Sequence, residues 1–457
     1  MSRRYAKDPI VDRSLRHSVR DAAAYSVMTG GGEAYFSAFA VFLKASPGQI
    51  GMLAALPPLL AAFAQVLSAW LGRRWQQRKK IILIGATVQG LAWIPLALLP
   101  IAFPTYAVPL LIACVVVYQF GTNFAGPQWS SLMAELVPPR RRGRFFARRT
   151  RVASATSFSA LVASGLILHE FTAYNATLIG FWIVFAIAAI ARFVSVYHLW
   201  CMVDPPGTTA AMEVPVSEDA WTRLRASPFA RFSVFFALIQ FAVAISSPFF
   251  AVYLLRDLGY SYLQFMSNSA VVVVVQFITL NWWGRLSDVF GNRLTLRVTG
   301  MLLPVLPALW LISHDYVYLL LVQVIAGLAW AGFSLSANNF LFDLVPADKR
   351  ATFMAFHNVL TSLGVFCGAL VGGYLATHLP ATWTWNGHTY QWFSGLLGVF
   401  LLSSVLRVVV VAIFLPRLKE VRDVKPMSVG GLIFRVARFH AVAGLVFDII
   451  GVRRPPR

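Results

Sequence analysis

Hydrophobic residues along this chain gather into twelve long stretches that are separated by polar segments. A helix needs about 20 mostly apolar residues to cross the hydrocarbon core of a bilayer, because lipid offers no partner for unpaired backbone groups. Each stretch is close to this length. We therefore predict an all-α polytopic membrane protein with twelve transmembrane helices, at about 21–43, 49–71, 81–101, 107–134, 152–168, 177–203, 229–255, 262–283, 294–313, 316–342, 352–377 and 390–415.

The distribution of charge indicates how these helices are oriented. The sequence carries 39 Lys and Arg against 18 Asp and Glu, a net charge of +21, although 58% of its residues are hydrophobic. With twelve spans, the two termini and every second loop share one side of the membrane, and they hold 35 of the 39 basic residues. Because Lys and Arg stay cytoplasmic during insertion, we expect both termini in the cytoplasm of a bacterial inner-type plasma membrane. The basic excess thus reports topology in a lipid bilayer, and it argues against nucleic-acid binding.

The two halves of the hydrophobic region resemble each other. Glu135-Leu-Val-Pro138 recurs as Asp343-Leu-Val-Pro346, and an Arg and a Phe follow both at the same spacings. Three further matches with similar offsets pair spans of one half with equivalent spans of the other. We therefore expect two pseudo-symmetric six-helix bundles. The predicted domains are an N-terminal bundle at 1–203, a cytoplasmic linker at 204–228, a C-terminal bundle at 229–415 and a basic amphipathic cytoplasmic tail at 416–457.

A polar turn in the second half resembles the signature loop of the major facilitator superfamily. It reads Gly284-Arg-Leu-Ser-Asp288-Val-Phe-Gly291-Asn292-Arg293, and the resemblance extends over about residues 20–415. The resemblance implies a secondary transporter that moves a small solute by alternating access, with this loop latching the cytoplasmic gate near the start of the fifth span. An ordinary basic turn is the alternative. The gating loop predicted in this way comprises Gly284, Arg285, Asp288, Gly291 and Arg293. The equivalent stretch of the first half, 72–80, has no acidic residue, which favours an asymmetric gate.

Glu33 is the candidate for proton coupling. It lies about 12 residues into the first span, or roughly 18 Å along a helix, close to the middle of the bilayer. An ionisable residue in hydrocarbon is costly and usually faces a cavity or a partner, and burial favours the protonated form that a proton carrier requires. A permanently protonated or hydrogen-bonded core Glu is an equally good interpretation.

Further polar residues lie on the spans that, by the same resemblance, line a central cavity. Tyr25 and Thr29 share the helical stripe of Glu33, and two other pairs are spaced by four residues and so occupy one face of a helix each. Amides and hydroxyls at such positions can bind a polar solute, although hydrogen bonding between helices is their more common use. The predicted cavity residues are Tyr25, Thr29, Gln119, Asn123, Gln240, Ser246, Ser334 and Asn338.

Two arginines lie deep inside spans at equivalent positions of the halves. We expect Arg192 and Arg407 to bind a carboxylate or backbone carbonyls within the protein, and attraction of an anionic substrate is the alternative interpretation.

Other functions find little support in the sequence. It contains no His-Glu-x-x-His, Walker A or Gly-x-Ser-x-Gly pattern, so we predict neither an enzyme nor an ATP-driven pump. The three Cys are far apart within apolar spans, and we expect no metal and no cofactor. A sensor or scaffold that keeps a transporter-like fold without moving a solute stays open as the alternative function.

Overall fold

Twelve membrane segments make up the computed structural model, which describes residues 5, 8–138, 141–205, 227–345, 350–385, 388–418 and 420. The first half consists of α1 (Pro9–Gly31) with η1 (Glu33–Tyr35) and α2 (Phe36–Phe42), α3 (Pro47–Trp75), α4 (Arg78–Leu91) with α5 (Trp93–Ala102) and η2 (Pro104–Tyr106), α6 (Ala107–Leu136), α7 (Arg142–Ala173) and α8 (Thr177–Trp200). The second half consists of α10 (Pro228–Ser246) with α11 (Phe249–Val252) and η4 (Tyr253–Asp257), α12 (Tyr262–Phe290), α13 (Asn292–Leu302) with α14 (Val305–Leu309), α15 (Tyr316–Leu344), α16 (Arg350–His378) and α17 (Leu396–Phe414) with η6 (Leu415–Arg417).

Among the described residues, ten of these segments are long and apolar enough to cross a membrane, and the first and ninth, which are not among the ten, are both interrupted. The first segment bends between α1 and α2 at Gly32, where an added Cβ would lie 2.4 Å from the Trp93 ring. The ninth segment is interrupted between α13 and α14 at Leu303 and Pro304. The second segment of each half begins with a Ser whose side chain forms a capping box with a Gln three residues later, at Ser46 for α3 and at Ser261 for α12.

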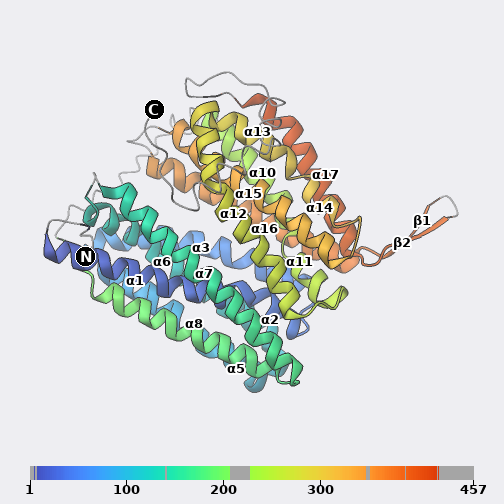
Figure 1. The fold of residues 1–457 in the computed structure, drawn as a ribbon, viewed down its shortest axis with the longest axis horizontal. Helices are drawn as coiled ribbons and strands as arrows, with labels where there is room; N and C mark the ends of the chain where they lie inside the picture. The colour runs from blue at the N-terminus through green and yellow to red at the C-terminus, as the bar shows by residue number, and fades with distance from the viewer. Residues whose placement is uncertain are drawn as a thin grey trace, which may run out of the picture.

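Among the described residues, a small β-hairpin is the one addition to the predicted all-α architecture. Strands β1 (Thr382–Trp385) and β2 (His388–Gln391) pair antiparallel between α16 and α17 and project from the bundle (Figure 1). Alternating Thr and Trp residues favour a strand over a helix, and Asn386-Gly387 between the strands is a preferred hairpin turn sequence. The last span therefore begins at Leu396 and not at Tyr390 as predicted.

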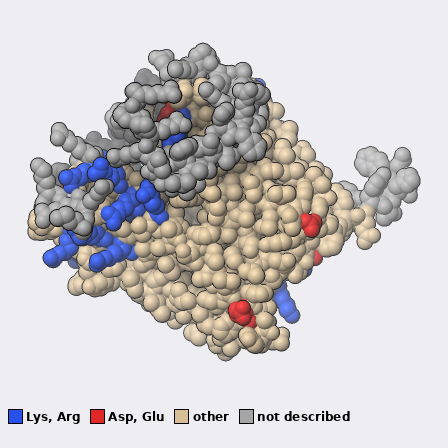
Figure 2. Space-filling model, in the orientation of Figure 1, with Lys and Arg blue, Asp and Glu red and all other residues tan. Residues whose placement is uncertain are grey.

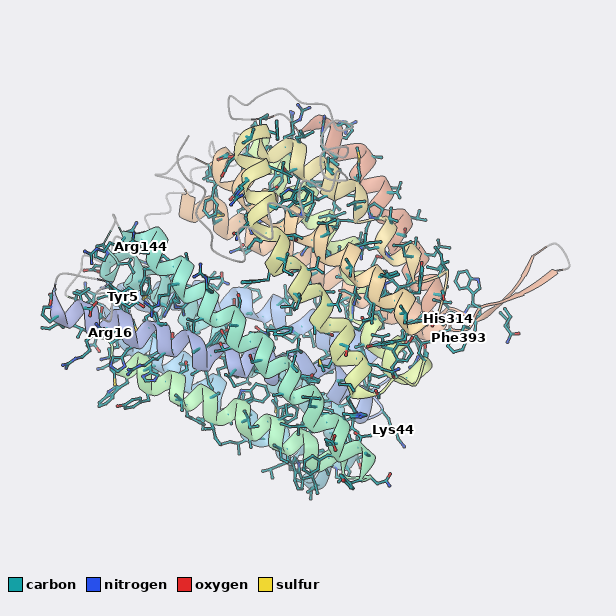
Figure 3. The ribbon with its side chains drawn as sticks, in the orientation of Figure 1. Tyr5, Arg16, Lys44, Arg144, His314 and Phe393 are labelled. Carbon is teal, nitrogen blue, oxygen red and sulfur yellow. The ribbon has the colours of Figure 1, made fainter. Side chains whose placement is uncertain are left out.

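The segments form two bundles that lie side by side (Figure 1). Figure 2 shows Lys and Arg gathered at one end of the N-terminal half, and Figure 3 places Arg16 and Arg144 there, with Lys44 and His314 at the other end. We call the end where α1 and α7 begin the basic end, and the other the opposite end. The predicted linker and tail lie almost wholly outside the described residues.

The two halves are joined at the opposite end. The largest hydrophobic cluster contains residues of both halves, and ring contacts cross between them, with centroids 6.1 Å apart for Tyr35 and Phe265 and 5.7 Å apart for Phe181 and Tyr262. The clusters at the basic end, among the described residues, each belong to one half. Because the largest apolar cluster joins the halves at the opposite end, the described ribbons of the two halves diverge toward the basic end (Figure 1).

Helices α3 and α16 form a close seam between the halves. A Cβ added at Gly51 of α3 would lie 2.7 Å from the Ala369 carbonyl oxygen and 2.9 Å from the Gly373 Cα of α16, so only glycine permits this approach. The far side of α16 packs equally tightly on α10 of its own half, where Gly364, Gly368 and Gly372 lie against backbone carbonyls. Helix α16 is thus held on both sides through glycine.

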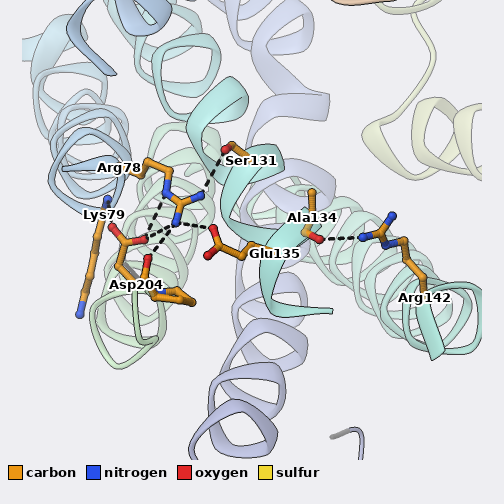
Figure 4. A network of polar contacts seen from close by, with 8 residues as sticks. Arg78, Lys79, Ser131, Ala134, Glu135, Arg142 and Asp204 are labelled. Atoms are coloured by element: carbon orange, nitrogen blue, oxygen red, sulfur yellow. Dashed lines mark hydrogen bonds and ion pairs between the residues drawn. The ribbon is translucent and has the colours of Figure 1, made fainter. Parts of the chain in front are cut away.

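Each half also carries a polar anchor at its basic end. In the first half, the buried Arg78 forms ion pairs of 2.8 Å with Glu135 and 2.9 Å with Asp204 and bonds Ser131 (Figure 4). At the equivalent position of the second half, Asn292 Nδ2 donates a 2.7 Å hydrogen bond to Asp343 Oδ2. The repeated acidic residue of the Leu-Val-Pro motif therefore holds the start of the third segment in both halves.

Candidate functional site

Glu33 lies at the break in the first membrane segment. It is the first residue of η1, immediately after α1 ends, and its side chain is half-buried. Tyr118 Oη donates a 2.8 Å hydrogen bond to Glu33 Oε2, and Gln119 Nε2 donates a 2.9 Å hydrogen bond to Glu33 Oε1. No Lys or Arg of the described residues forms an ion pair with it. Two neutral donors therefore hold this carboxyl group, so its charge depends on a proton and not on a fixed counter-ion.

A chain of amides continues from Glu33 along α6 to α3. Asn123 Nδ2 donates a 2.9 Å hydrogen bond to the Gln119 carbonyl oxygen, and its Oδ1 accepts a 2.7 Å hydrogen bond from Gln65 Nε2. The structure thus brings together three of the predicted residues, Glu33, Gln119 and Asn123, although the sequence named no partner for Glu33. Thr29 instead bonds its own helix at the Ser26 carbonyl oxygen.

A cavity of about 320 Å³ lies within the N-terminal bundle, lined from α1, α4, α6, α7 and α8. Its polar lining includes Asp21 and Tyr25 from α1, Arg149 from α7 and Arg192 from α8. Ser195 Oγ donates a 2.7 Å hydrogen bond to Asp21 Oδ1 and accepts one of 2.7 Å from Arg192 Nη1. Arg149 Nη2 lies 3.4 Å from Asp21 Oδ2, a long ion pair. Arg192 therefore reaches a carboxylate through a hydroxyl, while it also borders an open volume.

Aromatic rings fix both guanidinium groups. The Arg149 guanidinium lies over Trp129, 4.3 Å from the ring centroid, and the Arg192 guanidinium lies over Tyr25 at 5.1 Å. A stacked guanidinium keeps its N–H groups in the plane free to bond at its edge. The stacking therefore fixes the orientation of both guanidinium groups at the cavity wall.

A second cavity, of about 370 Å³, adjoins the first. It is lined from α3 and α6 and shares Thr122, Gly126 and Trp129 with the first cavity. Gly126 lies between the two, and a Cβ added there would meet no atom within 4 Å. The absence of a side chain at Gly126 therefore leaves free space where the linings of the two cavities meet.

The candidates of the second half are not gathered into one site. Ser246 is fully buried and bonds Ser403 and Arg407 within its own bundle, both at 3.0 Å, and Arg407 also bonds the Leu303 carbonyl oxygen. The Oε1 atom of Gln240 is buried without a hydrogen-bond partner among the described residues. Ser334 and Asn338 are exposed on α15.

The predicted gating loop forms the end of α12 and the start of α13. Gly291 caps α12 with φ of 91° and ψ of 156°, a conformation that residues with a Cβ rarely adopt. Asp288 is exposed and has no hydrogen bond or ion pair with another described residue, and Gly284 and Arg285 lie one helical turn before it. The backbone N–H of Arg293 donates a 2.8 Å hydrogen bond to Glu420 Oε2.

The sequence analysis did not single out Asp21, Tyr118, Trp129 or Arg149. Asp21 was the first residue of a predicted span, and Arg149 was counted in a loop, whereas α7 begins earlier, at Arg142. Asp21 lies four residues before Tyr25 and so shares its helix face. This spacing could have indicated that Asp21 lies beside the predicted cavity residues.

Comparisons with known proteins identify the family. The family model described as Major Facilitator Superfamily matches residues 22–252 and again 232–450, one match for each half. The quinolone resistance protein NorA of Staphylococcus aureus is 24% identical over 180 residues, which cover 38% of this chain and 43% of NorA. Hexose transporter 1 of Toxoplasma gondii is 28% identical over 127 residues, 27% of this chain and 22% of that protein. The aligned part of this chain thus spans less than half the length of these relatives.

Solved structures show the same fold. The nucleoside transporter NupG has a TM-score of 0.67 and 15% identity, with 90% of this chain and all of NupG covered. A D-xylose-proton symporter has a TM-score of 0.66 and 16% identity, with 91% of this chain and 99% of that chain covered. Because the family model accounts for both bundles and the fold agrees over their whole length, the chain belongs to the Major Facilitator Superfamily.

Proposed function

We propose that this protein is a secondary transporter that moves a small solute by alternating access and that proton binding at Glu33 biases its cycle. The observation that carries the coupling proposal is the place of Glu33, a half-buried carboxyl group held by Tyr118 and Gln119 at a helix break. The proposal assigns the basic end to the cytoplasm of a plasma membrane, following the charge of the loops. Family membership argues for a transporter and against an enzyme.

The position of Glu33 offers a route from protonation to the seam between the halves. Two residues further along η1, Tyr35 Oη donates a 2.7 Å hydrogen bond to the Leu161 carbonyl oxygen, and the Tyr35 ring contacts Phe265 of the other half. A gain or loss of charge at Glu33 changes its bonds to α6 and so the bend that positions Tyr35. Protonation therefore acts beside the contact that must open when the transporter turns outward.

The gating loop fits the same cycle. In the structure described here the ribbons of the two halves diverge toward the basic end (Figure 1), and exposed Asp288 has no ion pair among the described residues. When the basic end closes, α12 and the start of α7 approach each other, and Asp288 meets the basic residues that begin with Arg142 and Arg144. The equivalent stretch of the first half, 72–80, has no carboxylate, and its Arg78 is held within its own bundle.

The coupling proposal is tested by following the opening of the basic end as a function of pH. Spin labels at Ala147→Cys and Val289→Cys, exposed positions on α7 and α12, report the distance between the halves once the three native cysteines are replaced. In the wild-type background we expect the double electron-electron resonance distance distribution to change with pH. Glu33→Gln resembles the protonated carboxyl, so it should hold the acidic distribution at every pH.

A matched control is available at the opposite end of α7. Glu170 is exposed there, and Glu170→Gln should leave the pH response as in the wild-type background. A Glu33→Gln protein that still titrates like the wild type would remove Glu33 from the coupling role.

A further inference from the structure

We propose that the cavity bounded by α1, α4, α6, α7 and α8 binds a singly charged organic anion, a carboxylate with a compact apolar body. This inference rests on the proposed transport function and names the class of solute. It also gives Arg149 and the buried Arg192 a role beyond helix packing.

The charges that line the cavity favour an anion. Arg149 and Arg192 contribute two positive charges, and Asp21 contributes the one carboxylate among the lining residues. One positive charge is therefore left without a counter-charge in the cavity wall. In surroundings of low dielectric constant such an excess attracts one negative charge strongly, which fits a monoanion better than a neutral solute or a cation.

Arg192 has a donor that the protein does not use. Its side chain is buried, with 3% of the residue exposed, and Nη1 bonds Ser195, but Nε has no hydrogen-bond partner among the described residues. Leaving a buried donor of a charged group unpaired is costly. A ligand carboxylate in the cavity would bond the guanidinium group of Arg192, because carboxylates match the planar fork of a guanidinium well.

The remainder of the wall suits an apolar body. Arg149 and Arg192 are held over Trp129 and Tyr25, and the rest of the lining is largely small or aliphatic: Ala22, Ile82, Ala125, Ala153 and Leu199. A volume of about 320 Å³ is at the small end of the range for ligand sites. The cavity thus fits a small carboxylic acid anion such as an aromatic or branched aliphatic one.

Access to this cavity runs past Gly126. A side chain there would meet no protein atom at its Cβ, yet it would project into the space shared by the two cavities. Gly126→Leu therefore offers a way to fill the passage without disturbing the Asp21, Arg149 and Arg192 contacts. Gly143, at the exposed start of α7, is equally free of neighbours and serves as the matched control.

The test measures binding of benzoate to the purified full-length protein in detergent by thermal shift. Benzamide, benzylammonium and sodium chloride at the same ionic strength are the comparison probes. We expect benzoate alone to raise the unfolding temperature, because a ligand that binds only the folded state stabilises it. Gly126→Leu should abolish the shift, and Gly143→Leu should keep it.

Arg149→Gln tests the charge directly. Loss of one charged hydrogen-bond donor should weaken benzoate binding by about tenfold or more, while Arg149→Lys should retain part of the affinity. No shift with benzoate, an equal shift with benzamide, or a shift unchanged by Gly126→Leu or by Arg149→Gln would each overturn the proposal. The pH response of the spin-label distances stays intact in that event, so failure of the anion site is distinguishable from failure of the coupling at Glu33.

Discussion

Replacing Gly165 with Ala should push the two halves apart at the opposite end. In the described structure, the largest apolar cluster joins the halves at this end. Gly165 lies on α7 and faces α12 of the other half. A Cβ at this position would lie 2.4 Å from Met266 Cγ, 2.5 Å from Met266 Cβ and 2.8 Å from Tyr35 Oη. Because Met266 Cβ is fixed to the backbone, rotation of the Met side chain cannot relieve the overlap, and the two helices must move apart.

The expected magnitude follows from the cost of overpacking. Inserting one methyl group into a well-packed interface costs about 1–3 kcal/mol. This cost falls on the state in which the opposite end is closed and is relieved when that end opens. Gly165→Ala should therefore shift the equilibrium about 5- to 150-fold toward the state with a closed basic end.

Spin labels at Ala147→Cys and Val289→Cys measure this shift as growth of the shorter distance. Gly143→Ala is a control in open space, and Gly180→Ala adds a methyl group within one half, where its Cβ would lie 3.1 Å from Phe171 Cβ. Neither control should change the distribution. An unchanged or longer distance in Gly165→Ala would refute the account of how the opposite end is sealed.

Two further predictions concern stability, and both are measured by thermal unfolding in detergent. Arg78→Gln leaves two carboxylates without their cation. The Glu135 and Asp204 side chains are 34% and 23% exposed. We therefore expect the free energy of unfolding to fall by about 2 kcal/mol, which lies between the values for buried and surface ion pairs. Lys80→Gln, at an exposed position, should have almost no effect, and equal losses for both variants would contradict the anchor role. Gly291→Ala should cost about 1–3 kcal/mol, because φ of 91° with ψ of 156° strains a residue with a Cβ. Gly284→Ala, whose Cβ would meet only Leu335 at 3.8 Å, should be tolerated, so similar midpoints for the two glycine variants would exclude backbone strain as the cause.

The architecture could be predicted from the sequence because lipid imposes a length on apolar helices and an asymmetry on charged loops. The same rules do not report where a helix begins outside the hydrocarbon. Helix α7 starts ten residues before the predicted span, so Arg149 lies on a helix face and reaches Asp21 instead of belonging to a loop. Hydropathy also missed the hairpin before α17, since Trp and Tyr count as apolar in strands and helices alike.

The candidate site was predictable only in part. Glu33 stood out because a carboxyl group is rare in the middle of a span, but its partners Tyr118 and Gln119 come from a helix about 85 residues away in sequence. Polar residues of the second half could not be ranked, because a buried hydroxyl such as Ser246 Oγ looks the same in sequence whether it faces a cavity or Arg407. Contacts with neighbouring helices decide whether such a residue lines a cavity or bonds another helix. The sequence of a single helix does not contain this information.

The seam of Gly51 against Gly373 has a mechanical consequence. Dispersion attraction grows with the number of atoms in contact, and two glycines present hardly more than backbone to each other. Sliding or tilting at this point therefore meets few interlocking side chains, while α16 contacts α10 in the same way at three successive glycines, Gly364, Gly368 and Gly372. The two bundles can therefore change their relative tilt at α3 and α16, and the longer glycine contact favours movement of α16 and α10 together.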